Sequence, residues 1–240
     1  MSAKRNRIGV IAPFDMALDA EYWQLVPDDV SVHFTRLPIV DLPYGPEHAR
    51  SVADAVGLEA AARSLVRIGP EVVAFACTSA SFVDGVAGEA RIRRAIEAVG
   101  VPHATTPSGA LVEALTHAGV TRVAIGTPYE EALGEHLMAF LREAGLEPGS
   151  LVNLRLSDEE EVIAATPGTV AELAERAMFP GAQAVFLACT NLPTVGLLPD
   201  LGRRLGVPVM SANSVLMWAS LRRLSAGRSG PAPRDGGSPR

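Results

Sequence analysis

Short apolar runs alternate with longer amphipathic stretches along most of the chain. Runs such as "RIGVIA" (7–12), "EVVAFA" (71–76) and "QAVFLA" (183–188) are continuously apolar, which is typical of strands buried on both faces of a parallel sheet. The stretches 47–69 and 130–145 have helical spacing of apolar positions, and the second ends at Gly145, a suitable helix stop. This alternation predicts an α/β protein with parallel sheets.

The same order of elements occurs twice. "RIGVIAPF" resembles "RVAIGTPY" (122–129), "EVVAFACTS" resembles "QAVFLACTN", and "GVPHATTPSGALVEAL" (100–115) resembles "GVPVMSANSVLMWASL" (206–221). Three matches in the same order predict two similar Rossmann-like halves related by a pseudo-two-fold axis. We place the first half at residues 1–115 and the second half at residues 116–224. A crossing of the chain to the other half is allowed at the end of the first range. Residues 225–240 are rich in Gly, Pro, Ser and Arg and are predicted to be a disordered tail.

The two cysteines of the chain occupy matching places in this repeat. Cys77 and Cys189 each end an apolar run, and each is the centre of an Ala-Cys-Thr triplet. Ligands of open α/β sheets bind beyond the carboxyl ends of the strands, so two facing halves would place the thiols on opposite walls of one cleft. A lone cysteine is often only a small buried hydrophobic residue. The matched pair instead favours catalysis, in which one thiol attacks or removes a proton and the other returns a proton on the opposite face.

The turn after each cysteine has the composition of an anion-binding site. Backbone N–H groups together with Thr78, Ser79, Thr190 and Asn191 predict a cradle for a substrate carboxylate. The same N–H groups are expected to lower the pKa of one thiol. The five histidines show no partner spacing, so surface or capping positions are expected for them. No metal site is predicted, because C-x-x-C and H-E-x-x-H are absent, and the glycine-rich phosphate motifs are absent too.

Composition narrows the function classes. The chain has 240 residues, 48% of them hydrophobic, and a formal net charge of −6, which argues against a nucleic-acid surface. No apolar run reaches the roughly 18 residues needed to span a bilayer, so no membrane partner is expected. Two cysteines do not make a disulfide framework, and the N-terminus lacks a signal-peptide pattern. We therefore expect a cytoplasmic protein with free thiols and a small-molecule substrate.

The chain up to about Leu224 resembles the aspartate/glutamate racemase superfamily, and within it the branch of maleate cis-trans isomerases and arylmalonate decarboxylases. "TPYEEALGEHLMAFL" resembles the segment that carries this branch's active-site tyrosine, which implies that Tyr129 binds substrate. "CTSASF" resembles a carboxylate-binding turn, here with Thr78 and Ser79. The resemblance implies Cys77 and Cys189 as catalytic residues and no cofactor, and we expect a homo-oligomer.

This chain differs from members of the branch at several positions, and these differences bear on which reaction is expected. Decarboxylases have glycine where this chain has Cys77, whereas isomerases and racemases keep both cysteines. This favours cis-trans isomerisation of a maleate-type carboxylate, with Cys77 as nucleophile. Maleate isomerases carry an asparagine a few residues after the first strand, in the neighbourhood of Asp15 in this chain. They carry a second substrate-binding asparagine farther along, near the position of Glu159. "PFDMALDAEYW" also resembles ectoine-utilisation proteins of the superfamily.

Asp15 is therefore a candidate to bind a cationic group of the substrate or to pair with an arginine. Three alternatives stay open at this point: an amino-acid or hydantoin-type racemase, an arylmalonate-type decarboxylase, and a non-catalytic module that binds small carboxylates.

Overall fold

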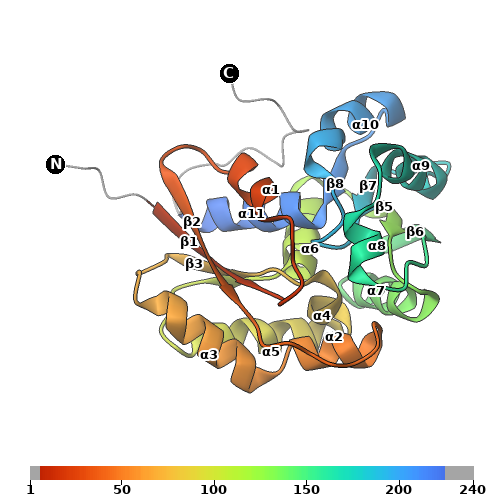
Figure 1. Cartoon of the computed structure of the whole chain (residues 1–240). Coiled ribbons are helices and arrows are strands. Elements are labelled where there is room, and N and C mark those ends of the chain that lie inside the picture. Colours follow the sequence, from red (N-terminus) through yellow and green to blue (C-terminus); the bar gives the residue numbers. More distant parts are fainter. Residues whose placement is uncertain (1–5, 225–240) are drawn as a thin grey trace.

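A computed structural model of the chain describes residues 6–224, which form two four-stranded parallel sheets with helices around them (Figure 1). The predicted tail, 225–240, lies outside the described residues. The strands are β1 (Asn6–Ala12), β2 (Val30–Arg36), β3 (Val72–Phe75), β4 (Ala104–Thr105), β5 (Arg122–Thr127), β6 (Glu147–Asn153), β7 (Ala184–Leu187) and β8 (Val209–Ser211).

Helices connect successive strands, because neighbouring parallel strands need a crossover connection. They are α1 (Asp19–Gln24), α2 (Pro46–Val52), α3 (Ala55–Val66), α4 (Thr78–Phe82), α5 (Gly85–Glu97), α6 (Pro107–His117), α7 (Glu131–Glu143), α8 (Glu159–Ile163), α9 (Pro167–Ala177), the 3-10 helix η1 (Val195–Leu197), α10 (Leu198–Leu205) and α11 (Ala212–Leu224). The stretch 47–69, expected to be one helical segment, is two helices. Asp54 separates them because its carboxylate caps α3 by accepting from the N–H groups of Val56 and Gly57.

The two sheets repeat one topology. Their strand orders are β2-β1-β3-β4 and β6-β5-β7-β8, and all pairs in both sheets are parallel. The strands before the two cysteines, β3 and β7, therefore hold the same position in their sheets. This confirms the prediction of two similar α/β halves with equivalent cysteine-bearing strands.

The first sheet is covered on both faces, which explains its continuous apolar strands. Val73 and Phe75 of β3 pack on one face with side chains of α3 and α5, while Val72 and Ala74 pack on the other face. The second face is covered in part by Leu216 of α11. Side chains alternate across the strand with period two, and every position meets a hydrophobic neighbour.

Two helices join the halves. Helix α6 follows the first sheet, yet Leu111 and Leu115 lie in the hydrophobic core of the second half. Helix α11 follows the second sheet, yet Leu216 and Met217 pack beneath the first sheet. The two helices also contact each other, and Figure 1 shows both between the sheets. The chain thus crosses between the halves after each sheet, and the shared core holds the halves in a defined orientation.

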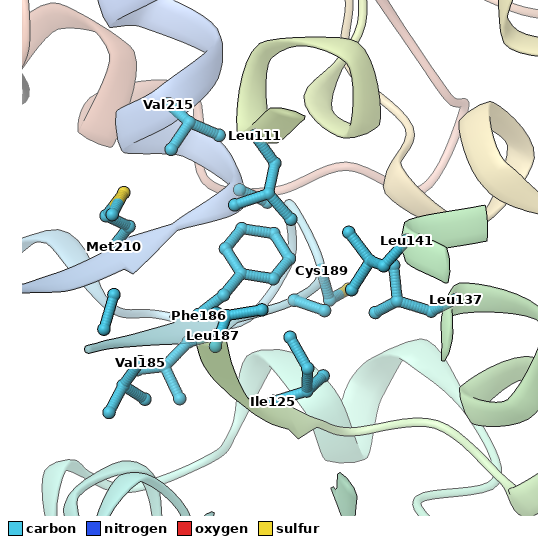
Figure 2. Close-up of a cluster of buried hydrophobic side chains, with 14 of the residues drawn as sticks. Leu111, Ile125, Leu137, Leu141, Val185, Phe186, Leu187, Cys189, Met210 and Val215 are labelled. Atoms are coloured by element: carbon cyan, nitrogen blue, oxygen red, sulfur yellow. The ribbon is translucent and has the colours of Figure 1, made fainter. Parts of the chain in front are cut away.

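The core of the second half supports the Cys189 strand. Figure 2 shows Phe186 of β7 near Leu111 of α6, and Leu137 and Leu141 of α7 beside Cys189. All five residues are buried. A close-packed interior resists changes in side-chain position, so the end of β7 is held firmly. Within residues 6–224, no helix is long and apolar enough to cross a membrane.

Candidate active site

Cys77 lies just beyond β3 at the start of the short helix α4. Its backbone is extended (φ −133°), and its side chain is 8% exposed. The Sγ atom lies 3.6 Å from Ser79 Oγ, and the backbone N–H of Ala80 also donates to the sulfur. The Cys77 sulfur therefore has two hydrogen-bond partners on the side of the following turn.

Cys189 lies just beyond β7 in a different backbone conformation. Its φ is 88°, in the left-handed region that residues with a Cβ atom rarely adopt, at a typical cost of about 1–3 kcal/mol. The N–H of Asn191 donates to Sγ at 3.4 Å. The hydroxyl groups of Tyr129 and Tyr44 also hydrogen-bond to the sulfur. The two cysteines thus end equivalent strands, but Cys189 has more donors and a strained backbone.

Burial controls the acidity of both thiols. It raises the pKa of Cys77 to about 12 and that of Cys189 to about 11, above the usual 9.0. The hydrogen-bond donors around each sulfur act in the opposite direction, but they are outweighed by the loss of hydration of the charged form. The sequence-based expectation of a lowered thiol pKa was wrong for this reason. The thiols also lie near each other, since negative charge on Cys189 contributes to the raised pKa of Cys77.

Tyr129 is a fully buried part of the site, 1% exposed, just beyond β5. Its N–H donates to Thr127 Oγ1 at 3.1 Å, and this hydroxyl donates to Asn153 at the end of β6. The Tyr129 ring lies 6.4 Å from that of Tyr44 and 5.9 Å from that of Phe82, measured between centroids. These contacts fix the ring, so its hydroxyl is held toward the Cys189 sulfur.

The four residues of the predicted carboxylate cradle divide into two pairs. Thr78 Oγ1 is buried and has no hydrogen-bond partner, and Ser79 lies beside the Cys77 sulfur. Thr190 instead donates its hydroxyl to the carbonyl of Ala76 at 3.0 Å.

Asn191 is likewise engaged with the chain itself. Its Oδ1 accepts from the N–H of Ala17 at 2.9 Å, and its amide nitrogen donates to the carbonyl of Asp15 at 3.3 Å. Thr190 and Asn191 thus hold the two halves together, whereas Thr78 has a free hydroxyl at the Cys77 turn.

Asp15 lies in the loop after β1 and is half-buried. Its carboxyl group hydrogen-bonds to that of Glu159, the first residue of α8, and its Oδ1 atom is buried without a partner. Loss of hydration and the charge of Glu159 raise the pKa of Asp15 to about 6, although nearby His48 acts in the opposite direction. Asp15 pairs with no arginine in the described chain, so that alternative from the sequence is excluded there.

Glu21 of α1 is a buried carboxylate that sequence reasoning missed, 8% exposed. It accepts from the N–H groups of Thr194 and Val195 at 2.8 and 3.0 Å and from the amide of Asn213 at 2.7 Å. Asn213 also donates to the carbonyl of Thr190 at 3.1 Å. One carboxylate of the first half thus anchors the loop that follows Cys189. No spacing motif marks it, because its partners lie more than 170 residues away.

Two more site residues, Tyr44 and His48, come from the loop before α2 and from α2 itself. His48 is buried, 6% exposed, with its ring 5.6 Å from that of Tyr44 and Nδ1 3.0 Å from the carbonyl of Leu42. The expectation of a surface or capping position was therefore wrong for His48. Neither residue has a counterpart in the sequence repeat, so the repeat could not identify them.

Comparisons with known proteins place this site in a family. The family model described as "Arylmalonate decarboxylase" matches residues 9–234, so the chain belongs to the arylmalonate decarboxylase family. An arylmalonate decarboxylase of Bordetella bronchiseptica is 34% identical over 85% of this chain and 87% of its own. A maleate isomerase of Nocardia farcinica is 29% identical over 91% of this chain and 90% of its own.

Solved structures of the same two kinds of enzyme share the fold. The Nocardia farcinica maleate cis-trans isomerase bound to TRIS superposes with a TM-score of 0.85 at 25% identity, covering 96% of this chain and 97% of that one. A liganded arylmalonate decarboxylase variant, in which a glycine is replaced by cysteine and a cysteine by serine, superposes with a TM-score of 0.83 at 31% identity. The match covers 95% of this chain and 96% of that one. A cysteine-to-serine variant of the Nocardia enzyme has been solved with a covalently bound succinylcysteine intermediate.

Asp15→Asn is expected to raise the free energy of unfolding at pH 7.5 by about 1–3 kcal/mol, at about 1.4 kcal/mol per pKa unit. The folded-state pKa, about 6, exceeds the ordinary value of 3.8, so the folded protein disfavours the ionised form. The resulting penalty is absent below pH 3.8, grows up to about pH 6 and is complete above it. Urea denaturation should therefore show a stabilised variant at pH 7.5 and nearly equal stabilities at pH 4. Glu160→Gln, at an exposed neighbouring position, is the control, and an equal advantage at both pH values would contradict the argument.

Proposed function

We propose that this protein is a cofactor-independent cis-trans isomerase that uses two cysteines on a small unsaturated carboxylate of the maleate type. The observation that carries the proposal is the thiol pair: Cys77 and Cys189 end equivalent strands of the two sheets, and negative charge on Cys189 contributes to the raised pKa of Cys77. Support comes from the maleate isomerase relatives and from the succinylcysteine intermediate in one of them. Decarboxylases have a similar turn with glycine in place of Cys77. The presence of Cys77 in this chain therefore further supports isomerisation.

The reactive form in this proposal carries one proton on the two sulfur atoms. The Cys77 thiolate forms a carbon–sulfur bond to one alkene carbon, and Cys189 gives its proton to the adjacent carbon. The former double bond is now single and rotates. Cys189 then takes the proton back, the carbon–sulfur bond breaks, and the trans product leaves a Cys77 thiolate. Negative charge passes to Cys189 and back, so no electrons are gained or lost.

The surroundings of Cys189 suit its part in this sequence. Its thiolate would be stabilised by the hydroxyl groups of Tyr129 and Tyr44 and by the N–H of Asn191. These donors lower the pKa of Cys189, although burial outweighs them. Raised pKa values mean that few molecules carry the thiolate at neutral pH, so turnover should increase with pH between 7 and 9.

The remaining roles follow from position. We assign carboxylate binding to Thr78 and Ser79, because Thr78 has a buried hydroxyl without a partner. Tyr129 contacts the substrate beside Cys189. Thr190 offers its backbone N–H group to the carboxylate, and the N–H of Asn191 holds the Cys189 sulfur. The side chains of both residues keep the halves in register. A cytoplasmic location and a homo-oligomeric state are also part of the proposal.

A second candidate function is decarboxylation of an arylmalonate-type diacid, favoured by the 34% identity to the Bordetella enzyme. In that reaction Cys189 alone would protonate the planar intermediate left after carbon dioxide departs. Cys77 would then occupy space that glycine leaves open in decarboxylases, so a bulky aryl substrate would fit less well.

One NMR experiment separates these functions. The protein is incubated in heavy water with maleate, phenylmalonate, and L-aspartate or L-glutamate in turn. Appearance of fumarate from maleate supports the proposal, carbon dioxide and deuterated phenylacetate support decarboxylation, and deuterium at a saturated α-carbon supports racemisation. Binding of these acids without conversion of any would contradict the proposal and favour a non-catalytic carboxylate-binding module.

A further inference from the structure

Two carboxyl groups meet between the halves beside the thiols. Asp15 comes from the loop after β1 in the first half, and Glu159 begins α8 in the second. Helix α8 is brought there because Leu156 and Arg155, just before it, donate N–H groups to the carbonyls of Pro128 and Tyr129. The two carboxyl groups lie within interaction range of each other, and the charge of Glu159 adds to the effect of burial in raising the pKa of Asp15. They therefore bring acceptor oxygens from both halves together at one place.

Asp15 also faces the reacting groups. Its negative charge raises the pKa of Cys77, of Cys189 and of Tyr44, so it lies within electrostatic range of both sulfur atoms. Besides these groups and the Glu159 carboxyl, His48 of α2 also acts on Asp15 and lowers its pKa. The carbonyl of Asp15 also accepts from the side chain of Asn191, whose backbone N–H donates to Cys189 Sγ, so the loop that carries Asp15 borders the thiol site.

We propose that the Asp15–Glu159 pair determines substrate choice, and that it selects an unsaturated monocarboxylate whose far end carries an N–H donor, an amide or an ammonium group, in place of a second carboxylate. The assignment of a reaction to this substrate rests on the proposed isomerase function. The choice of ligand does not, because it can be measured by binding alone.

The contacts of the site support this choice. Thr78 and the turn after Cys77 supply donors, which suit one carboxylate end. The Asp15 side supplies acceptors, and Asp15 Oδ1 is buried without any donor of its own. An N–H group satisfies such an atom, whereas a carboxylate would leave it unpaired and add a like charge in a poorly hydrated place. The two ends of the site thus have opposite hydrogen-bonding character.

The binding test uses two unreactive acids of equal length, succinate and its monoamide succinamate, measured by isothermal titration calorimetry at pH 7.5. We expect the wild-type protein to bind succinamate at least ten times more tightly than succinate. Asp15→Asn and Glu159→Gln each replace a carboxyl by an amide and should reduce this preference by tenfold or more, mainly through tighter binding of succinate. Glu160→Gln, at the exposed neighbour of Glu159, should leave the ratio unchanged.

Equal or stronger binding of succinate by the wild-type protein, or a ratio that neither variant changes, would overturn the proposal. Turnover is tested separately, with maleate and its monoamide maleamate as probes and with the trans products followed by NMR. If succinamate is preferred but neither probe is isomerised, the substrate selection stands and the isomerase function fails. If maleate is isomerised faster than maleamate and succinate binds more tightly, the function stands and the selection fails.

Discussion

Replacing Cys77 or Cys189 by serine is expected to lower turnover of the confirmed substrate by about 10³-fold or more in each case. A serine hydroxyl keeps the size and hydrogen bonding of the thiol, but it is a far weaker acid and a poorer nucleophile. Each cysteine acts on one face of the substrate in the proposed reaction, so the loss of either stops the cycle. The double variant should be little worse than either single one, because the two residues act as a unit.

The controls for this result are straightforward. Both thiols are buried, 8% and 6% exposed, so each variant needs a melting curve to show that it folds. Ser220→Ala, which removes a buried hydroxyl far along α11, controls for a general effect of small buried substitutions. Retention of wild-type rates by Cys77→Ser or Cys189→Ser would remove the two-cysteine mechanism. Cys77→Gly should likewise end isomerisation, and decarboxylation of phenylmalonate by that variant would reveal a one-cysteine site.

Replacing Glu21 by alanine is expected to have the second largest effect. The change leaves the N–H groups of Thr194 and Val195 and the amide of Asn213 without their acceptor, at a cost of about 1–3 kcal/mol in folding stability. It also releases the loop after Cys189, whose left-handed backbone must be held by its surroundings. We expect kcat to fall by about tenfold or more, with a smaller change in KM, since the loop positions a reacting atom and not the whole substrate.

A matched pair of variants distinguishes positioning from general destabilisation. Glu21→Gln keeps an oxygen acceptor for the two backbone N–H groups but turns an amide toward Asn213, so its kcat should lie between those of the wild type and Glu21→Ala. A core substitution of similar cost away from the loop, Ile96→Val, should lower the melting temperature with little change in kcat. Equal kcat values for Glu21→Ala and the wild type, at a temperature where both are folded, would show that Glu21 has no positioning role.

The raised thiol pKa values show why local sequence could not predict reactivity. The turns after Cys77 and Cys189 do supply N–H donors, as their composition predicted. Whether such donors lower a pKa depends on how much water the sulfur retains, and that depends on what packs over it. Here Tyr44, Tyr129 and the meeting of the two halves exclude water, and burial outweighs the donors.

The side chains of Thr190 and Asn191 illustrate the same point for binding. Their residue types predicted a carboxylate cradle, and in the matching turn of the first half the Thr78 hydroxyl is without a partner. In the folded protein the side chains of Thr190 and Asn191 are instead hydrogen-bonded to backbone groups of residues 15, 17 and 76. A turn near the partner half satisfies its polar groups across the interface, which no feature of the turn itself indicates.

The pattern of the sequence alone determined the α/β class, the duplication and the matching places of the two cysteines. These follow from features local in the chain: apolar runs of strand length, helical spacing between them and a repeat of both in the same order. The tertiary structure alone decided that α6 and α11 exchange halves, that Tyr44, His48 and Glu21 join the site, and that Asp15 meets Glu159. Glu21 meets Thr194 and Asp15 meets Glu159 across more than 100 positions of the chain, and such contacts depend on how the two halves pack. Local patterns record which surfaces are apolar, but not which distant polar groups those surfaces bring together.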